Sequence, residues 1–137
     1  MPRAPEDLAI PPVPGAPSPP ERVLLVEDNP LIALDVEDHL RALGVGQVDV
    51  ASSSELALEL LEGGGHGFAL LDFNLGGETS EPVARALDRR GIPFAFATGY
   101  GEVKCFAGGL VGKEVPVLIK PYAKAELEDL LRRLIPA

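Results

Sequence analysis

The sequence has very little cysteine, few basic residues and no long apolar run, and each shortage excludes a class of protein. Among its 137 residues Cys105 is the only cysteine, so no disulfide can form within the chain and we expect a cytoplasmic location. Lysine and arginine number 12 against 21 acidic residues, and the net charge of −9 argues against a nucleic-acid partner, which would require a basic face. No apolar run approaches the roughly 20 residues that span a bilayer, so we expect no membrane segment.

Proline is concentrated at the amino-terminal end. Residues 10–20 read IPPVPGAPSPP, and proline at this density opposes both helices and sheet ladders. We therefore expect a disordered proline-rich tail over residues 1–20, with a polyproline ligand for a partner protein as the alternative. Residues 21–136 are numerous enough for one domain with a single core.

From Glu21 onward, short apolar runs alternate with amphipathic stretches. The apolar runs predict five strands, at residues 22–29, 47–53, 67–75, 92–100 and 115–121. Leucine spacing and the residues at each end predict helices at 30–44, 53–65, 80–91 and 123–135. Because strands that alternate with helices form a parallel sheet covered on both faces, we expect a doubly wound α/β fold.

Two details of this alternation carry further expectations. Between Thr98 and Val115 the chain reads GYGEVKCFAGGLVGKE, and each interior glycine costs a helix up to about 1 kcal/mol, so the helix before the fifth strand should be short or irregular. The helix at 30–44 has leucines at helical spacing, which indicates its buried face; they are Leu31, Leu34, Leu40 and Leu43.

His39 and His66 have no partner at ligand spacing, and both are expected to be solvated.

Polar residues follow four of the five expected strands. The first strand ends in Glu27 and Asp28, the third in Asp72, the fourth in Thr98 and the fifth in Lys120. Each has an ordinary explanation on its own, such as capping of the next helix by Asp28. The carboxyl ends of parallel strands meet at one edge of the sheet, however, so together these residues predict a site.

The residue types at this edge point to phosphoryl transfer. Three carboxylates repel one another unless a hard cation lies between them, and Mg²⁺ accepts carboxylates while leaving positions for phosphate oxygens. The lysine adds a positive charge and the threonine a hydroxyl donor, which completes a phosphoryl-transfer site. Asp72 is the candidate nucleophile and would form an acyl phosphate.

Four motifs in this order give the chain a resemblance to a known family. VEDN carries the acidic pair, LLDFNL the central aspartate, ATG the hydroxyl, and IKPY the lysine before proline. Over residues 21–136 the sequence resembles a response-regulator receiver domain of two-component signalling. The stretch PFAFATGYG further resembles the FAT GUY receivers, which are usually stand-alone regulators.

The resemblance implies a flavodoxin-like sheet of strand order 2-1-3-4-5 and a role for each site residue. Asp72 would accept a phosphoryl group from a sensor histidine kinase, Lys120 would pair with the acyl phosphate, and Thr98 would donate a hydrogen bond to it. The implied Mg²⁺ ligands are Asp28, Asp72, the backbone carbonyl of Asn74 and, through water, Glu27. The Lys120–Pro121 peptide would be cis. Output would be phosphorylation-dependent binding to a downstream protein, or a phosphorelay, by a monomer or weak dimer.

One position departs from the family pattern. Many receivers have an aromatic switch residue three positions before the lysine, where this chain has Val117. Tyr100, two residues after Thr98, is the available aromatic residue, and we expect it to take over part of the switch role.

Two other functions remain open at this stage. A haloacid-dehalogenase-like phosphatase also orders aspartate, threonine and lysine along such a sheet, but it requires an aspartate where this chain has Asn74. A degenerate receiver that binds partners without phosphate is the other alternative, and the altered residue at Val117 favours it mildly.

Overall fold

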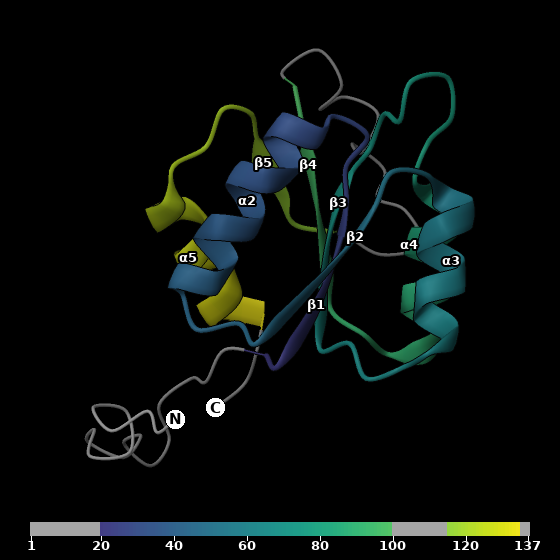
Figure 1. Cartoon of the computed structure of the whole chain (residues 1–137), viewed down its shortest axis with the longest axis horizontal. Coiled ribbons are helices and arrows are strands. Elements are labelled where there is room, and N and C mark those ends of the chain that lie inside the picture. The colour runs from purple at the N-terminus through teal and green to yellow at the C-terminus, as the bar shows by residue number, and fades with distance from the viewer. Residues whose placement is uncertain (1–19, 100–114, 135–137) are drawn as a thin grey trace.

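The computed structural model describes residues 20–99 and 115–134 of the chain. Within them, five strands alternate with four helices along most of the chain (Figure 1). The strands are β1 (Arg22–Val26), β2 (Gln47–Ala51), β3 (Phe68–Asp72), β4 (Phe94–Thr98) and β5 (Val117–Ile119). The helices are α2 (Pro30–Ala42), α3 (Ser54–Glu62), α4 (Glu81–Arg90) and α5 (Lys124–Leu134).

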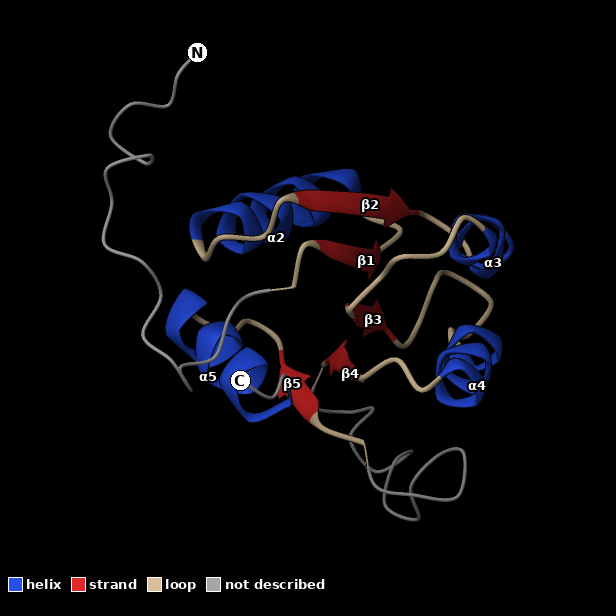
Figure 2. Ribbon diagram, turned by 90° about the horizontal axis from the view of Figure 1, so that it is seen from below, coloured by secondary structure: helices blue, strands red, loops and turns tan. Residues whose placement is uncertain are grey.

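The strands form one parallel sheet in the order β2-β1-β3-β4-β5, which confirms the predicted fold class and strand order. Figure 2 shows α2 and α5 on one face of this sheet and α3 and α4 on the other. Each face has its own apolar core. The central strands β3 and β4 are buried along their whole length, because helices cover them on both sides. The expected irregular helix before β5 lies outside the described residues.

The register of the sheet brings the ends of the strands to a common edge. Asp72 pairs with Ala97, and Thr98, the next residue, pairs with Ile119 in β5. Lys120 follows directly after Ile119, and its peptide bond to Pro121 is cis, as expected. The last residues of three neighbouring strands therefore lie side by side.

Helix α2 is capped by Asn29, and only part of its expected leucine face is buried. The Oδ1 atom of Asn29 accepts hydrogen bonds from the backbone N–H groups of Leu31 at 2.9 Å and Ile32 at 3.3 Å, so Asn29 caps the helix and Asp28 does not. The buried face consists of Ala33, Val36 and Leu40. The expectation for Leu31 and Leu34 was wrong: they are 77% and 57% exposed, because the stripe 33-36-40 faces the sheet.

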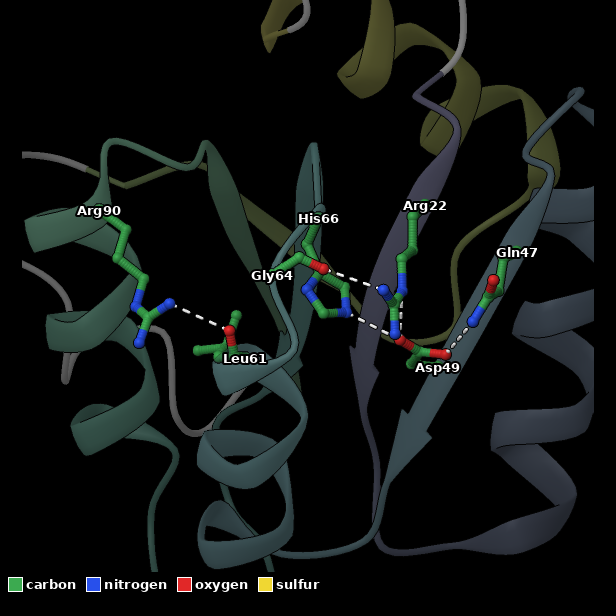
Figure 3. Close-up of polar contacts among 7 residues, drawn as sticks. All are labelled: Arg22, Gln47, Asp49, Leu61, Gly64, His66 and Arg90. Carbon is green, nitrogen blue, oxygen red and sulfur yellow. Dashed lines mark hydrogen bonds and ion pairs between the residues drawn. The ribbon is translucent and has the colours of Figure 1, made fainter.

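His66 is not solvated, contrary to expectation. Its side chain is fully buried, and its Nε2 atom lies 2.8 Å from Oδ2 of Asp49 in β2 (Figure 3). The same carboxylate accepts hydrogen bonds from Arg22 Nε at 2.7 Å and from Gln47 Nε2 at 2.8 Å. Burial alone would raise the pKa of Asp49, but the hydrogen bonds from Gln47, His66 and Arg22 outweigh it and lower that pKa. The glycine-rich turn before β3 thus contains a structural histidine. His39 is partly exposed, with its Nε2 atom 3.8 Å from Oδ1 of Asp35, but its Nδ1 atom is buried.

Within the described residues, no helix is both long and apolar enough to cross a bilayer.

Candidate functional site

Three carboxylates meet where β1 and β3 end. Oxygen atoms of Glu27, Asp28 and Asp72 all lie within 4.8 Å of one another. Glu27 and Asp72 are only 4% and 9% exposed, whereas Asp28 is exposed. The strand register places Asp72 at this edge, and the residue after Asp28, Asn29, caps α2.

These carboxylates fit a magnesium ion. Octahedral coordination at about 2.1 Å puts ligand oxygens roughly 3 to 4 Å apart, which is compatible with the observed cluster, and carboxylate oxygens are hard ligands of the type that Mg²⁺ prefers. Asn74 lies two residues after Asp72 on the exposed loop that leaves β3. Which of these groups ligate the ion, including the Asn74 carbonyl and a water on Glu27, stays a prediction.

Lys120 joins two of the carboxylates. Its Nζ atom donates a hydrogen bond to Oε1 of Glu27 at 2.9 Å and lies 3.3 Å from Oδ2 of Asp72. Its backbone N–H donates to the carbonyl of Thr98 at 2.8 Å, which ties the end of β5 to the end of β4. Thr98 itself is 1% exposed. The residues that the sequence analysis placed at this edge are therefore brought together.

The surroundings of Asp72 make its carboxyl group harder to ionise than that of an ordinary aspartate. Burial raises the pKa of Asp72 to about 6, against the attraction of Lys120 and with a further contribution from the negative charge of Glu27. Burial would lower the pKa of Lys120, but its hydrogen bond to Glu27 and the charges of Asp72 and Glu27 raise it, so the ammonium remains charged. A perturbed carboxylate beside a fixed cation is typical of functional sites.

The loop after β3 is a tight turn that approaches the acidic pair. Asn74 pairs with Thr79 in a short antiparallel bridge, and the Oδ1 atom of Asn74 accepts from the Gly76 N–H at 3.1 Å. Gly76 has a φ of +68°, and a Cβ atom built on it would lie 3.2 Å from Oδ2 of Asp28. The positive φ and the close approach both call for glycine at this position.

Neither the altered position Val117 nor Tyr100 has its part in switching tested by the structure. Val117 begins β5, is half-buried and packs against the core on the α3 and α4 side. Tyr100 lies outside the described residues.

An apolar groove beside Lys120 was missed by the sequence analysis. It has a volume of about 470 Å³ and lies between α2 and the turn that follows β5. Its lining residues are Leu31, Ile32, Asp35, Val36, His39, Lys120, Pro121 and Tyr122. Burial raises the pKa of Tyr122 far above its ordinary value, and the charges of Glu27, Asp35 and Asp72 add to this. The signal for this groove that the sequence offered was the presence of two apolar residues, Leu31 and Ile32, outside the buried stripe of α2.

Comparison with known families and structures gives one consistent result. The profile described as "Response regulator receiver domain" matches residues 23–132. The search of curated proteins found no match.

Several solved structures are similar to this chain. SdrG from Sphingomonas melonis Fr1 is 41% identical, with a TM-score of 0.69 over 83% of this chain and 95% of that one. The receiver domain of the sensor histidine kinase PA1611 from Pseudomonas aeruginosa PAO1, whose structure has magnesium coordinated in its active site cleft, is 25% identical, with a TM-score of 0.72 over 84% and 97%. The anti-anti-sigma factor PhyR from Bartonella quintana is 25% identical, with a TM-score of 0.69 over 83% of this chain but 48% of that one.

Proposed function

The chain belongs to the response regulator receiver domain family, and we propose that it accepts a phosphoryl group on Asp72 from a sensor histidine kinase. The observation that carries the proposal is the meeting of Asp72 with Lys120 at 3.3 Å, inside a cluster of three carboxylates. A family member with this cluster acts as a signalling phosphoacceptor. The FAT GUY subtype stays a prediction from the PFAFATGYG stretch.

The transfer step needs a nucleophile and a place for the departing electron pair. One carboxylate oxygen of Asp72 attacks the phosphorus of a phosphohistidine, the P–O bond forms and the P–N bond breaks. The electron pair stays on the imidazole nitrogen, which takes a proton from solvent. Hydrolysis later reverses the modification: water attacks the phosphorus, the P–O bond breaks, and inorganic phosphate, a proton and the Asp72 carboxylate result.

Each neighbour of Asp72 has a role in this proposal. Asp28 and Asp72, with the Asn74 carbonyl and a water on Glu27, would hold Mg²⁺, which supplies positive charge to the transferring phosphoryl group. Lys120 keeps a second positive charge beside the Asp72 carboxylate. Thr98, buried at the end of β4, would donate its hydroxyl to the phosphoryl group and so couple the modification to the segment that begins with Tyr100.

The apolar groove supports a protein donor. It includes Lys120, so a macromolecule seated on Leu31 and Ile32 would lie beside the phosphoacceptor edge. Leu31, at 77% exposed, is a large apolar side chain with little burial of its own, as expected of a contact surface. We propose that the kinase segment carrying the phosphohistidine docks here.

The output of the protein is proposed to be binding to a second protein, or onward phosphoryl transfer. The PhyR relative is described as an anti-anti-sigma factor, which is a regulator of other proteins. The downstream partner of this chain and its monomeric or weakly dimeric state stay predictions.

Phosphotransfer profiling tests the proposal. The full chain with Mg²⁺ is offered to each autophosphorylated histidine kinase of its source cell, and one kinase should transfer its label within seconds to minutes. Asp72→Asn should abolish labelling, while Asp38→Asn, an exposed aspartate on α2, should label as the wild type does.

Three outcomes would contradict it. Continued labelling of Asp72→Asn would show that another residue is the acceptor. Repeated turnover of a phosphomonoester would favour the haloacid-dehalogenase-like phosphatase instead. Partner binding that is equal with and without phosphate would favour the degenerate receiver.

A further inference from the structure

The junction between β2 and α3, residues 51–54, contributes no charged side chain to the site, yet it contacts both halves of it. We infer that this junction positions the metal-binding groups, with Ser54 and Glu78 as positioning residues for the β3–α4 loop. The inference rests on the proposed function for the identity of the ion, and the contacts that carry it are independent of that ion.

The first half of the site is tied to the junction through the backbone. The N–H of Glu27 donates to the carbonyl of Ala51 at 2.9 Å, directly after the pairing of Val26 with Ala51. Ala51 is fully buried, and the next residues turn into α3 with Ser53 as its cap. The junction therefore fixes the backbone position from which Glu27 and Asp28 extend.

The second half is tied to the junction through side chains. The Oε1 atom of Glu78 accepts a hydrogen bond from the N–H of Ser54 at 3.1 Å, and the hydroxyl of Ser54 donates to the carbonyl of Thr79 at 2.9 Å. The first N–H groups of a helix have no partner within the helix, and its N-terminus favours a negative charge, so the Glu78 carboxylate suits this place. Ser54 is only 7% exposed, which shields both bonds from water.

The loop transmits this attachment to Asn74 through a short ladder. The N–H of Leu75 donates to the carbonyl of Glu78 at 2.8 Å, and the N–H of Ser80 donates to the carbonyl of Phe73 at 3.0 Å. These two bonds frame the bridge between Asn74 and Thr79. Any displacement of residues 78 and 79 from α3 therefore moves the Asn74 backbone, which carries the proposed carbonyl ligand.

The same loop also reaches the first half of the site. Its tip at Gly76 lies against the Asp28 carboxylate, with 3.2 Å between Oδ2 and the position of a Cβ atom. Release of the loop would thus disturb Asp28 as well as Asn74. Because Mg²⁺ requires near-ideal octahedral geometry, small displacements of its ligands should weaken binding.

The test compares variants of the full chain that remove a hydrogen bond of Ser54 to Glu78 or to Thr79 with variants that keep both. Glu78→Ala removes the acceptor, and Ser54→Ala removes the donor to Thr79. Glu78→Gln keeps an acceptor oxygen. Glu55→Ala is the matched control, since it removes an exposed glutamate from the first turn of α3 itself. Mg²⁺ affinity is measured from amide NMR shifts of Asn74 and Leu75, and amide hydrogen exchange of Ser54 and Leu75 is measured without metal.

We expect Glu78→Ala and Ser54→Ala to weaken Mg²⁺ binding about three- to tenfold, the range that loss of a helix-terminal hydrogen bond produces. Their Ser54 and Leu75 amides should exchange faster before any metal is added. Glu78→Gln and Glu55→Ala should stay within about twofold of the wild type, since neither removes an acceptor from the loop.

Equal Mg²⁺ affinity in Glu78→Ala and Glu55→Ala would overturn the inference, as would unchanged exchange at Leu75 in both Glu78→Ala and Ser54→Ala. Failure of the proposed function is seen separately, as label on Asp72→Asn or as no Mg²⁺ binding by the wild type. In that case the exchange rates at Leu75 still decide whether the junction holds the loop. A urea unfolding midpoint for each variant excludes global destabilisation as the cause of weaker binding.

Discussion

Asp72 lies in surroundings that oppose its own ionisation when no metal is bound. It is 9% exposed, burial raises its pKa to about 6, and Glu27 adds to the rise while Lys120 only partly offsets it. In the metal-free protein the ionised form of such a carboxylate is destabilised, and a bound cation or a transferred phosphoryl group would relieve this. The residue that would do the chemistry is therefore expected to cost stability.

Asp72→Asn should stabilise the metal-free protein at pH 7 to 8 by about 1–3 kcal/mol. For an acid whose pKa is raised on folding, the free energy of unfolding is highest below the unfolded pKa and falls as pH rises through about 6. Asparagine does not lose that energy, so the gain should vanish below about pH 4. Urea unfolding with a chelator across this pH range measures it.

The exposed Asp28→Asn variant is the control and should show a much smaller change. An Asp72→Asn variant that is less stable than the metal-free wild type at pH 8 would contradict the prediction.

Which site residues could be read from the sequence depends on how each is placed. Asp72, Thr98 and Lys120 follow apolar strands directly, so the strand pattern alone locates them at one edge. Glu78 could not be found in this way, because its contact with Ser54 joins loop to helix across 24 residues and leaves no periodic signal.

Helix α2 shows how an element can be predicted correctly while its face is not. Its start and length agree with the leucine, proline and glycine signals, yet Leu31 and Leu34 face outward. Leucine spacing does not distinguish a stripe against the sheet from one that lines a groove, since both repeat every three to four residues. The smaller Ala33 and Val36 occupy the buried positions.

Leu31→Ser should reduce phosphoryl transfer from the cognate kinase about tenfold, because it removes an apolar contact worth about 1.4 kcal/mol from the proposed docking groove. Labelling by acetyl phosphate, which needs no docking, should be unchanged. Stability should change by less than about 0.5 kcal/mol, since the side chain is largely exposed. Initial rates with both donors provide the measurement.

Leu56→Ser on α3 is the matched control, a leucine that is 37% exposed and far from the groove lining. An equal loss of transfer in Leu31→Ser and Leu56→Ser would count against the groove as the docking surface.

At the scale of the whole molecule, the two ends of the sheet have separate tasks. The carboxyl ends carry the proposed chemistry, whereas Arg22, Asp49 and His66 form a partly buried network nearer the other end (Figure 3). Arg22 also donates to the carbonyl of Gly64 at 2.9 Å, so the network joins β1, β2 and the turn before β3. Its role in the structure is to hold these elements in register.

Asp49→Asn should lower the free energy of unfolding at pH 7 by about 1–3 kcal/mol, since it weakens hydrogen bonds from charged and buried partners. The pKa of Asp49 is lowered on folding, so its contribution is complete above the unfolded pKa and is lost as pH falls. The difference from the wild type should therefore shrink between about pH 5 and pH 3.

Urea unfolding midpoints across that pH range check this, with exposed Asp38→Asn as the control. A destabilisation that stays constant down to pH 3 would show that the lost contribution does not depend on charge.

The architecture as a whole was accessible from the sequence because local signals agree with the global fold. Apolar runs that alternate with capped helices predict a parallel sheet, and right-handed crossover connections leave few topologies for it. The strand order followed from the resemblance. The burial of His66 was not accessible, because its partner Asp49 lies 17 residues earlier in β2 and the glycines around His66 indicate only a turn. A polar pair between a turn and a strand depends on how the folded elements pack, which the pattern of apolar residues does not specify.

Electroneutrality offers a separate view of the cluster at the strand ends. Three carboxylates, those of Glu27, Asp28 and Asp72, and the single ammonium of Lys120 leave a surplus of two negative charges when all are ionised. One doubly charged ion cancels that surplus, a sodium or potassium ion leaves half of it, and a triply charged ion overshoots. We therefore expect the charge of an ion to decide which ions this site binds, before ion size or coordination number is considered.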